Sequence, residues 1–250
     1  STIGPSIMIY ALITVRSKST RLPQKCFLPF GDCTVLEHVV RRALHNEIIP
    51  IICTTTNKED FGIIDIARKL QVKYYCGSEI NKLKRWNDCC KNFNIKSFHT
   101  VDADDPFFCG DEIKRSYALL EKGFDMITPS PSSSNGGATV GYSLTSDIVN
   151  RACNSISEDT DTEMMWSFLE KVDGIKIHNL NEPRNSIITE RMTLDYEEDY
   201  IKLLEVLRSV GPFATRSQIS ECLLKNPNLN DINSSKNNEW KKNQEDKSLK

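Results

Sequence analysis

The sequence has no long apolar run and no excess of charge of one sign. Its longest apolar stretch, residues 7–15, is about half of the roughly 20 residues that a membrane-spanning helix needs, and no basic leader or cleavage site accompanies it. Thirty-two Lys and Arg residues oppose 34 Asp and Glu residues, so no overall basic field draws the chain to nucleic acid or to a membrane surface. We therefore expect a cytoplasmic protein that binds anions locally, with no nucleic-acid or membrane partner.

Motifs for zinc, dinucleotides and mononucleotide-binding loops are also missing. No Cys-x-x-Cys pair occurs and the four histidines are scattered, which excludes the usual structural zinc sites. The nine cysteines are an odd number and include the adjacent Cys89 and Cys90, so we interpret them as reduced thiols. Without GxxxxGK[ST] or GxGxxG, kinase and dehydrogenase functions lose their main sequence support.

What the sequence does contain is a regular alternation of strand-like and helix-like segments, which predicts an α/β fold. The first apolar run is typical of a strand buried on both faces of a mostly parallel sheet. Thr34-x-x-Glu37 is a capping box that begins a helix. Strands are expected at 8–15, 48–54, 72–75, 97–101, 124–128 and 175–180, and helices at 35–44, 59–70, 78–93, 111–121, 146–153, 161–172, 196–210 and from 215.

The second half of the chain is organised differently. Residues 129–141 form a Pro-, Ser- and Gly-rich loop that is long for an ordinary connection, so it is an active-site lid, a domain excursion or a solvent loop. From Asn226 onward the chain is polar and rich in Asn and Lys. We expect one domain over residues 8–226, with an excursion at about 130–180 and a polar tail or linker at 227–250.

A basic loop follows the first strand. Four basic residues lie within ten positions and alternate with hydroxyl side chains: Arg16, Ser17, Lys18, Ser19, Thr20, Arg21 and Lys25. In open α/β sheets, ligands bind beyond the carboxyl ends of the strands, and cations with hydroxyl donors suit a polyphosphate. The alternative is an exposed basic loop without a ligand.

Two acidic segments are candidates for metal binding. Asp102, Asp104 and Asp105 end a strand, and carboxylates gathered in this way are often neutralised by a cation, here magnesium. They would equally suit a turn with capping aspartates. Asp195 lies at a strand-to-helix junction, where a carboxylate can cap the helix, hold a metal, or do both.

Five motifs in order resemble one family. They are RxxSxRLPxK at 16–25, TTTN at 54–57, GSE at 77–79, the strand end xADxP at 102–106, and R-x-T-x-D-x-x-E-D at 191–199. Over about residues 9–205 the chain resembles the cytidylyltransferases that make CMP-Kdo, CMP-sialic acids and spore-coat polysaccharide precursors. The resemblance implies a Rossmann-like, mostly parallel mixed sheet of the nucleotide-diphospho-sugar transferase type, with a small dimerisation excursion. It also implies a homodimer in which an acidic acceptor attacks the α-phosphate of CTP, with Mg.

The resemblance also implies roles for individual residues. Lys25 and Arg16 match the catalytic basic residues that hold the triphosphate, and Lys25 is the nearer to the α-phosphate. Asp104 and Asp195 match the metal-holding aspartates. Lys18 stands where the family often has Gly. The resemblance also implies two further groups of nucleotide contacts. Around the phosphates these are Thr14, Val15, Ser19, Thr20 and Arg21. The contacts to cytosine and ribose are Thr54, Thr55, Thr56 and Ser78.

For the acceptor, the resemblance is closest to the phosphonate cytidylyltransferases, which activate 2-aminoethylphosphonate. Its ammonium would bind to Tyr142, Asp161 and Glu163, and its phosphonate to Arg184 or Arg191. Alternatively, Asp161 caps a helix, Glu163 is a first-turn acid and the residues after it are core or dimer interface. Some members of this group are joined to a transaminase, which would make the tail a linker.

Two other enzymes are compatible with the sequence. A CMP-sugar-acid synthetase would use the same chemistry on Kdo or a sialic-acid-like acceptor. A glycosyltransferase on the same fold would use Asp102-Ala103-Asp104 as a DxD metal site, although it would not need the Lys25 loop.

Overall fold

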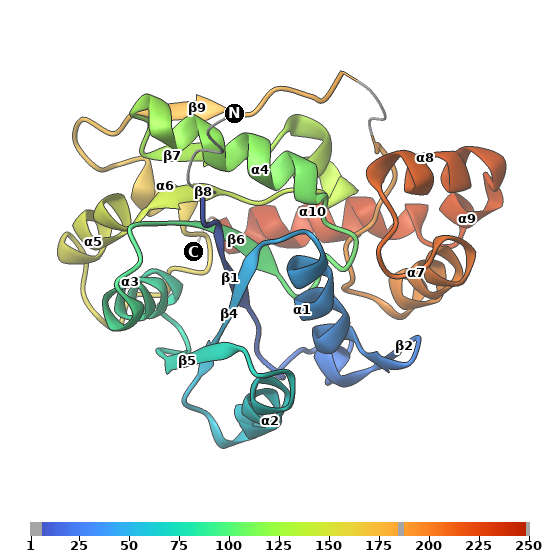
Figure 1. Ribbon diagram of the computed structural model, residues 1–250, viewed down its shortest axis with the longest axis horizontal. Coiled ribbons are helices and arrows are strands. Elements are labelled where there is room, and N and C mark those ends of the chain that lie inside the picture. The colour runs from blue at the N-terminus through green and yellow to red at the C-terminus, as the bar shows by residue number, and fades with distance from the viewer. Residues whose placement is uncertain (1–6, 185–187, 249–250) are drawn as a thin grey trace, which may run out of the picture.

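The computed structural model describes residues 7–184 and 188–248, which form a mixed α/β fold (Figure 1). The strands of the main sheet are β1 (Tyr10–Thr14), β4 (Ile49–Thr55), β5 (Lys73–Gly77), β6 (Ser97–Asp102), β7 (Met126–Thr128), β8 (Ser143–Thr145) and β9 (Ile177–Asn179). Within the described residues they are ordered β5-β4-β1-β6-β8-β7-β9. Strands β5, β4, β1 and β6 are parallel neighbours, and β8 runs antiparallel to β6 and β7. The predicted mostly parallel mixed sheet is confirmed.

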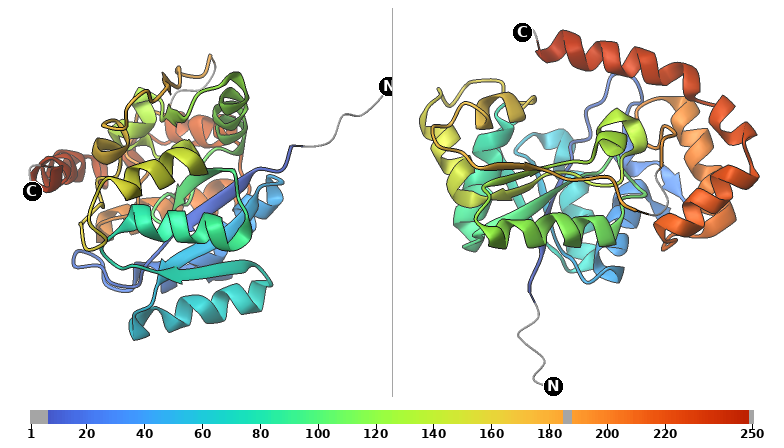
Figure 2. Two further views of the ribbon diagram at one scale, coloured as in Figure 1. Left: turned by 90° about the vertical axis from the view of Figure 1, so that its left-hand side faces the viewer. Right: turned by 90° about the horizontal axis from the view of Figure 1, so that it is seen from above.

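Helices cover both faces of this sheet (Figure 2). One face carries α1 (Val35–His45), α2 (Phe61–Leu70) and α4 (Gly110–Leu119), and the other carries α3 (Lys82–Phe93), α5 (Ser146–Asn154) and α6 (Trp166–Leu169). Ala11 and Ile13 of β1 pack in the first core, whereas Leu12 packs in the second. This alternation explains why the first strand reads as a continuous apolar run.

Short elements complete the first two-thirds of the chain. They are η1 (Lys25–Phe27), the hairpin of β2 (Pro29–Phe30) with β3 (Cys33–Thr34), η2 (Lys58–Asp60), η3 (Leu120–Lys122) and the π-helical turn η4 (Ser133–Gly137). The predicted capping box is present: Glu37 N donates to the Thr34 hydroxyl at 3.2 Å, and Thr34 N donates to the Glu37 carboxylate at 2.9 Å. All nine cysteines are free thiols.

The structure corrects the helix expected at 161–172, of which only α6 forms. The Thr162 hydroxyl accepts from Leu83 N at 3.0 Å and donates to Asn81 at 2.8 Å, so this segment completes the N-terminus of α3. These tertiary hydrogen bonds hold residues before Met164 in a loop, despite apolar side chains at helical spacing. In addition, β8 and β9 belong to the main sheet although they lie in the expected excursion.

The chain from Glu197 onward forms a group of helices on one side of the sheet. Helices α7 (Glu197–Val210) and α8 (Arg216–Lys225) pack in a third core with Phe30 and Phe107, and the short α9 (Asn228–Asp231) follows. Within the segment expected to be a polar tail or linker, the chain forms the helix α10 (Ser234–Ser248), which has no buried side chain. In Figure 2, α10 runs from the α7–α9 group toward the side of α5 and α6. Within the described part of the chain, no helix combines the length and apolarity needed to cross a bilayer.

Candidate functional site

A cavity of about 850 Å³ lies at the carboxyl ends of β1 and β6. Its walls come from the basic loop, the start of α3, η4, the segment before α6, and α10. It brings together these predicted residues: Thr14, Val15, Arg16, Ser19, Thr20, Arg21, Lys25, Asp104, Tyr142, Asp161, Glu163 and Asp195. The loop 129–141 also contributes to the wall, so it is not a solvent loop.

Asp60 anchors the start of the basic loop through hydrogen bonds to Ser17. The buried Asp60 carboxylate accepts from both Ser17 N and the Ser17 hydroxyl, each at 2.7 Å, and also from the Thr55 hydroxyl at the end of β4. A carboxylate that holds a backbone N–H and two hydroxyls leaves the loop little freedom. The basic side chains that follow Ser17 are therefore presented to the cavity from a fixed base.

Lys25 lies between Asp104 and Asp195, the two aspartates that the family resemblance predicts to hold a metal. Its Nζ is 3.1 Å from Asp104 Oδ2 and 3.3 Å from Asp195 Oδ1, and it donates to Leu194 O at 3.2 Å. Arg21 Nη2 is 2.8 Å from the other oxygen of Asp195. Burial by itself lowers the pKa of Lys25, but Asp104 and Asp195 raise it above the ordinary lysine value. The ammonium is therefore charged at neutral pH.

The two carboxylates beside Lys25 are oxygen ligands of the kind that divalent cations take, and the Lys25 ammonium occupies the point on which they converge. One oxygen of Asp104 and one of Asp195 converge on a single point, although 91 residues of sequence separate them. Magnesium is commonly held by one or two carboxylates, with substrate phosphates and water completing its shell. Asp105 is a poorer ligand, because burial and then the charges of Asp102 and Asp104 raise the pKa of its carboxyl. Asp104 and Asp195 are thus the residues that would hold the metal.

The opposite end of the cavity carries Glu163. Its Oε1 accepts from Lys247 Nζ of α10 at 3.0 Å and lies 3.8 Å from Arg16 Nη2. Burial opposes its ionisation, but Lys247 and then Arg16 lower the pKa of Glu163 below the ordinary value. Burial raises the pKa of Tyr142, which lines the same cavity, to about 12, so that phenol remains a hydrogen-bond donor.

Several predicted residues lie outside the cavity lining. Thr54 and Thr55 are fully buried and Thr56 is exposed beside them. The Ser78 hydroxyl accepts from Asn81 N at 3.2 Å, so Ser78 is used in the turn before α3. Arg184 is exposed, and it is not among the residues that line the cavity.

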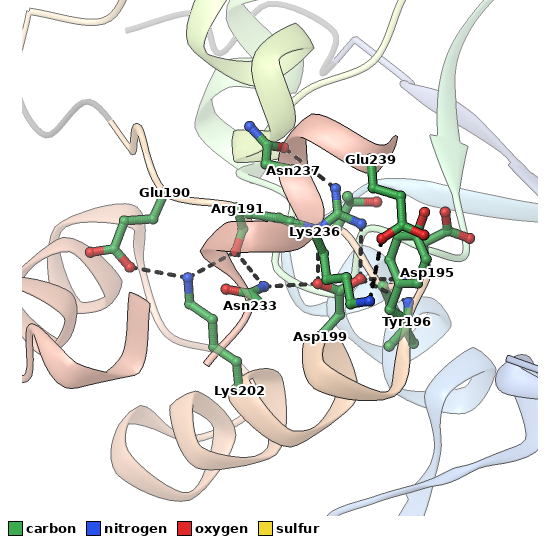
Figure 3. Close-up of polar contacts among 12 residues, drawn as sticks. Glu190, Arg191, Asp195, Tyr196, Asp199, Lys202, Asn233, Lys236, Asn237 and Glu239 are labelled. Carbon is green, nitrogen blue, oxygen red and sulfur yellow. Dashed lines mark hydrogen bonds and ion pairs between the residues drawn. The ribbon is translucent and has the colours of Figure 1, made fainter. Parts of the chain in front are cut away.

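Arg191 lies in a buried ion pair instead of the cavity (Figure 3). Its Nε and Nη2 donate to the two oxygens of Asp199 at 2.8 and 2.9 Å. Asp199 also accepts from Asp195 N at 2.9 Å and from Asn233 Nδ2, just before α10, at 2.8 Å. The network therefore fixes the backbone of Asp195 and ties it to the C-terminal helix.

We expect Asp199→Asn to destabilise the fold by about 3–5 kcal/mol, because it leaves the buried Arg191 guanidinium without its counter-charge. Thermal or denaturant unfolding measures this loss. The control is Glu205→Gln on the same helix, whose partner Arg208 is exposed and whose ion pair contributes little. An Asp199→Asn variant as stable as the control would contradict the structural importance of the network.

The sequence did not indicate the contributions of α3 and α10 to the cavity. Lys82 and Arg85 of α3 line it, as do Trp240, Lys241 and Gln244 of α10. The α10 sequence has no apolar stripe that would have predicted a packed helix. The Arg85 position carried a weak signal, because it follows the GSE motif at the start of a helix.

Comparisons with known proteins identify the family and the fold. Residues 10–167 match the family model described as cytidylyltransferase. An uncharacterized protein of Methanocaldococcus jannaschii is 27% identical over 238 residues, which cover 90% of this chain and 94% of that protein. A cytidylyltransferase structure from Leptospira borgpetersenii serovar Hardjo-bovis has a TM-score of 0.76 at 22% identity, covering 89% of this chain and 97% of that one. A CMP:2-keto-3-deoxy-manno-octonic acid synthetase complexed with CTP has a TM-score of 0.62 at 12% identity, covering 81% and 99%.

Proposed function

Because the chain belongs to the cytidylyltransferase family, we propose that it transfers CMP from CTP to 2-aminoethylphosphonate and releases pyrophosphate, with a divalent cation such as Mg. The observation that carries this proposal is the convergence of Lys25, Asp104 and Asp195 on one point, beside the anchored basic loop. A site of this kind binds a polyphosphate and neutralises charge at a reacting phosphorus.

In the proposed reaction, a phosphonate oxygen forms a bond to the α-phosphorus while the bond from that phosphorus to the bridging oxygen breaks. The electron pair leaves with pyrophosphate. No general base is needed, because the attacking oxygen is already an anion. Arg16 and Arg21 bind and orient the triphosphate, and Lys25 offsets the negative charge at the α-phosphate. A bound divalent cation, held by Asp104 and Asp195, would supply Lewis-acid neutralisation of the phosphate oxygens.

The acceptor end is supported by the contacts of Glu163. This ionised carboxylate already accepts from a primary ammonium, that of Lys247, at 3.0 Å. The ammonium of 2-aminoethylphosphonate has the same chemistry, so we propose that it binds to Glu163 in exchange with Lys247. Asp161 and Tyr142 line the same cavity and offer a second carboxylate and a phenol.

We expect Glu163→Gln to raise KM for 2-aminoethylphosphonate by about tenfold, because a charge-assisted hydrogen bond contributes roughly 1.5–3 kcal/mol. KM for 2-hydroxyethylphosphonate, which has no ammonium, should change little. Steady-state assays with both acceptors make the comparison. Glu158→Gln is the matched control, because that side chain is exposed on the preceding segment. An equal rise of KM for both acceptors would show that Glu163 does not read the ammonium.

The proposed function is tested by pyrophosphate release from CTP and Mg with three separate acceptors: 2-aminoethylphosphonate, Kdo and N-acetylneuraminate. Release with the phosphonate alone is the expected result. The cavity of about 850 Å³ also has room for a sugar acid, so a CMP-sugar-acid synthetase is the second candidate. Release with a sugar acid alone would establish that candidate and overturn the acceptor proposed here. The homodimer and the fusion to a transaminase stay predictions.

A further inference from the structure

Arg85 is a buried arginine with donors that nothing in the described residues uses. It lies on α3, is only 3% exposed and lines the cavity. Its Nε and Nη1 are buried and have no hydrogen-bond partner among the described residues. A guanidinium has five donors and no acceptor, and an unsatisfied buried donor is costly. Arg85 is therefore arranged for a ligand that brings hydrogen-bond acceptors.

The position of Arg85 is fixed by a close approach of α3 to β5. A Cβ added at Gly77 would lie 3.1 Å from Arg85 Cγ and 3.4 Å from Arg85 Cα, so the arginine stem packs directly on the Gly77 backbone. This gives a physical reason for the Gly of the GSE motif. A larger residue there would displace the stem, and the guanidinium with it.

The guanidinium belongs to a different part of the cavity from the Lys25 cluster. Burial lowers the pKa of Arg85, and the groups that act on it are Cys53, Arg16, Asp60 and Asp102. Cys53 lies in β4, Arg16 follows β1, Asp102 ends β6, and Asp60 holds the start of the basic loop. The phosphate-binding residues Arg21 and Lys25 lie beside Asp195 and Asp104, of which Asp104 follows β6, and Arg16 follows the neighbouring strand β1. The Arg85 stem instead packs on Gly77 at the end of β5, beyond β4 in the sheet order. With the triphosphate bound by Arg16, Arg21 and Lys25, the nucleoside end of CTP is the part of the nucleotide that lies on the Arg85 side.

Cytosine presents two neighbouring acceptors, N3 and O2, whereas uracil has a donor at N3. The threonines expected to read the base, Thr54 and Thr55, are buried outside the cavity lining. We propose that Arg85 donates to the N3 and O2 edge of cytosine and thereby selects CTP against UTP. A donor-only side chain is suited to this choice, because uracil would turn its N3–H toward another donor. The inference rests on CTP as the nucleotide substrate of the proposed function.

The test measures the binding of CTP, UTP and inorganic tripolyphosphate by calorimetry, without an acceptor. The variants are Arg85→Gln, whose amide both donates and accepts, and Arg85→Lys, which keeps the charge but loses the planar fork. Lys84→Gln is the matched control, because Lys84 is adjacent on α3 and pairs with Asp88 at 2.6 Å. Thermal unfolding checks that each variant is folded. Should Arg85→Gln fail to fold, Arg85→Lys carries the test.

We expect the ratio of CTP to UTP affinity to fall about tenfold or more in both Arg85 variants, with tripolyphosphate affinity unchanged. The control should keep the wild-type ratio. A parallel loss of CTP, UTP and tripolyphosphate affinity would assign Arg85 to a phosphate and overturn the proposal. An unchanged ratio would overturn it too. Wild-type protein that binds no CTP would instead contradict the proposed function, so the two failures are distinguishable.

Discussion

Lys25→Ala should lower kcat by about 10²–10³-fold while weakening CTP binding by much less. The ammonium lies within 3.3 Å of both Asp104 and Asp195 and is only 12% exposed, so its charge acts at short range in a poorly solvated place. Charge that is placed where negative charge develops stabilises the transition state more than the ground state. Steady-state kinetics together with a CTP binding titration separate the two effects.

The chain provides a matched control on the same loop. The Lys18 side chain is 67% exposed, and its nearest carboxylate, on Glu79, is 4.0 Å away. Lys18→Ala should therefore change kcat by only a few-fold, because exposed ion pairs contribute little. Equal losses in kcat and in CTP affinity for Lys25→Ala would mean that Lys25 only binds the nucleotide. An unchanged kcat would remove Lys25 from the mechanism altogether.

Asp104→Asn is expected to reduce metal-dependent activity by a similar factor, about 10²–10³-fold, and to leave the protein folded. The substitution removes one of the two carboxylates that converge on the proposed metal position. The Asp104 side chain is 42% exposed and Asp195 still faces Lys25 in the variant, so the substitution should lower the free energy of unfolding by no more than about 1 kcal/mol. Activity as a function of Mg concentration, with a thermal unfolding curve, measures both effects.

Asp102→Asn is the informative comparison for this second variant. Asp102 is exposed and lies two residues earlier at the same strand end, and the ion pairs of Lys25 in the described chain are with Asp104 and Asp195. It should lose far less activity than Asp104→Asn. Equal losses in the two variants would favour the DxD site of a glycosyltransferase. If Asp104→Asn unfolds, the acidic run is structural and not a metal site.

Local signals in the sequence were enough to predict most of the fold. Short β-branched runs and the Thr34 capping box depend on neighbours along the chain, and both were found where they were expected. The pairing of Asp104 with Asp195 came from the family resemblance, and in the structure both lie against Lys25. The strand runs and the capping box need no knowledge of distant contacts, whereas the pairing of Asp104 with Asp195 needed the resemblance.

The rest depended on tertiary contacts that a single sequence does not display. Thr55 faces Asp60 and supports the basic loop from outside the cavity. Arg191 is close in sequence to Asp195, yet its guanidinium is turned to Asp199, where the start of α7 places two carboxylate oxygens. Each of these side chains has a polar character that suits a ligand, but a partner within the protein takes its hydrogen bonds.

The attachment of α10 has a consequence for how substrates reach the cavity. This helix has no fully buried side chain, and it contacts the rest of the described chain through polar pairs, such as Lys247 with Glu163, and through the Trp240 ring beside the Arg191 guanidinium. Its docking therefore draws little on the hydrophobic effect, so its local opening should require much less free energy than global unfolding. Raised ionic strength would weaken the Lys247 contact without disturbing the sheet. Access to the acceptor end can thus vary with salt while the catalytic framework remains intact.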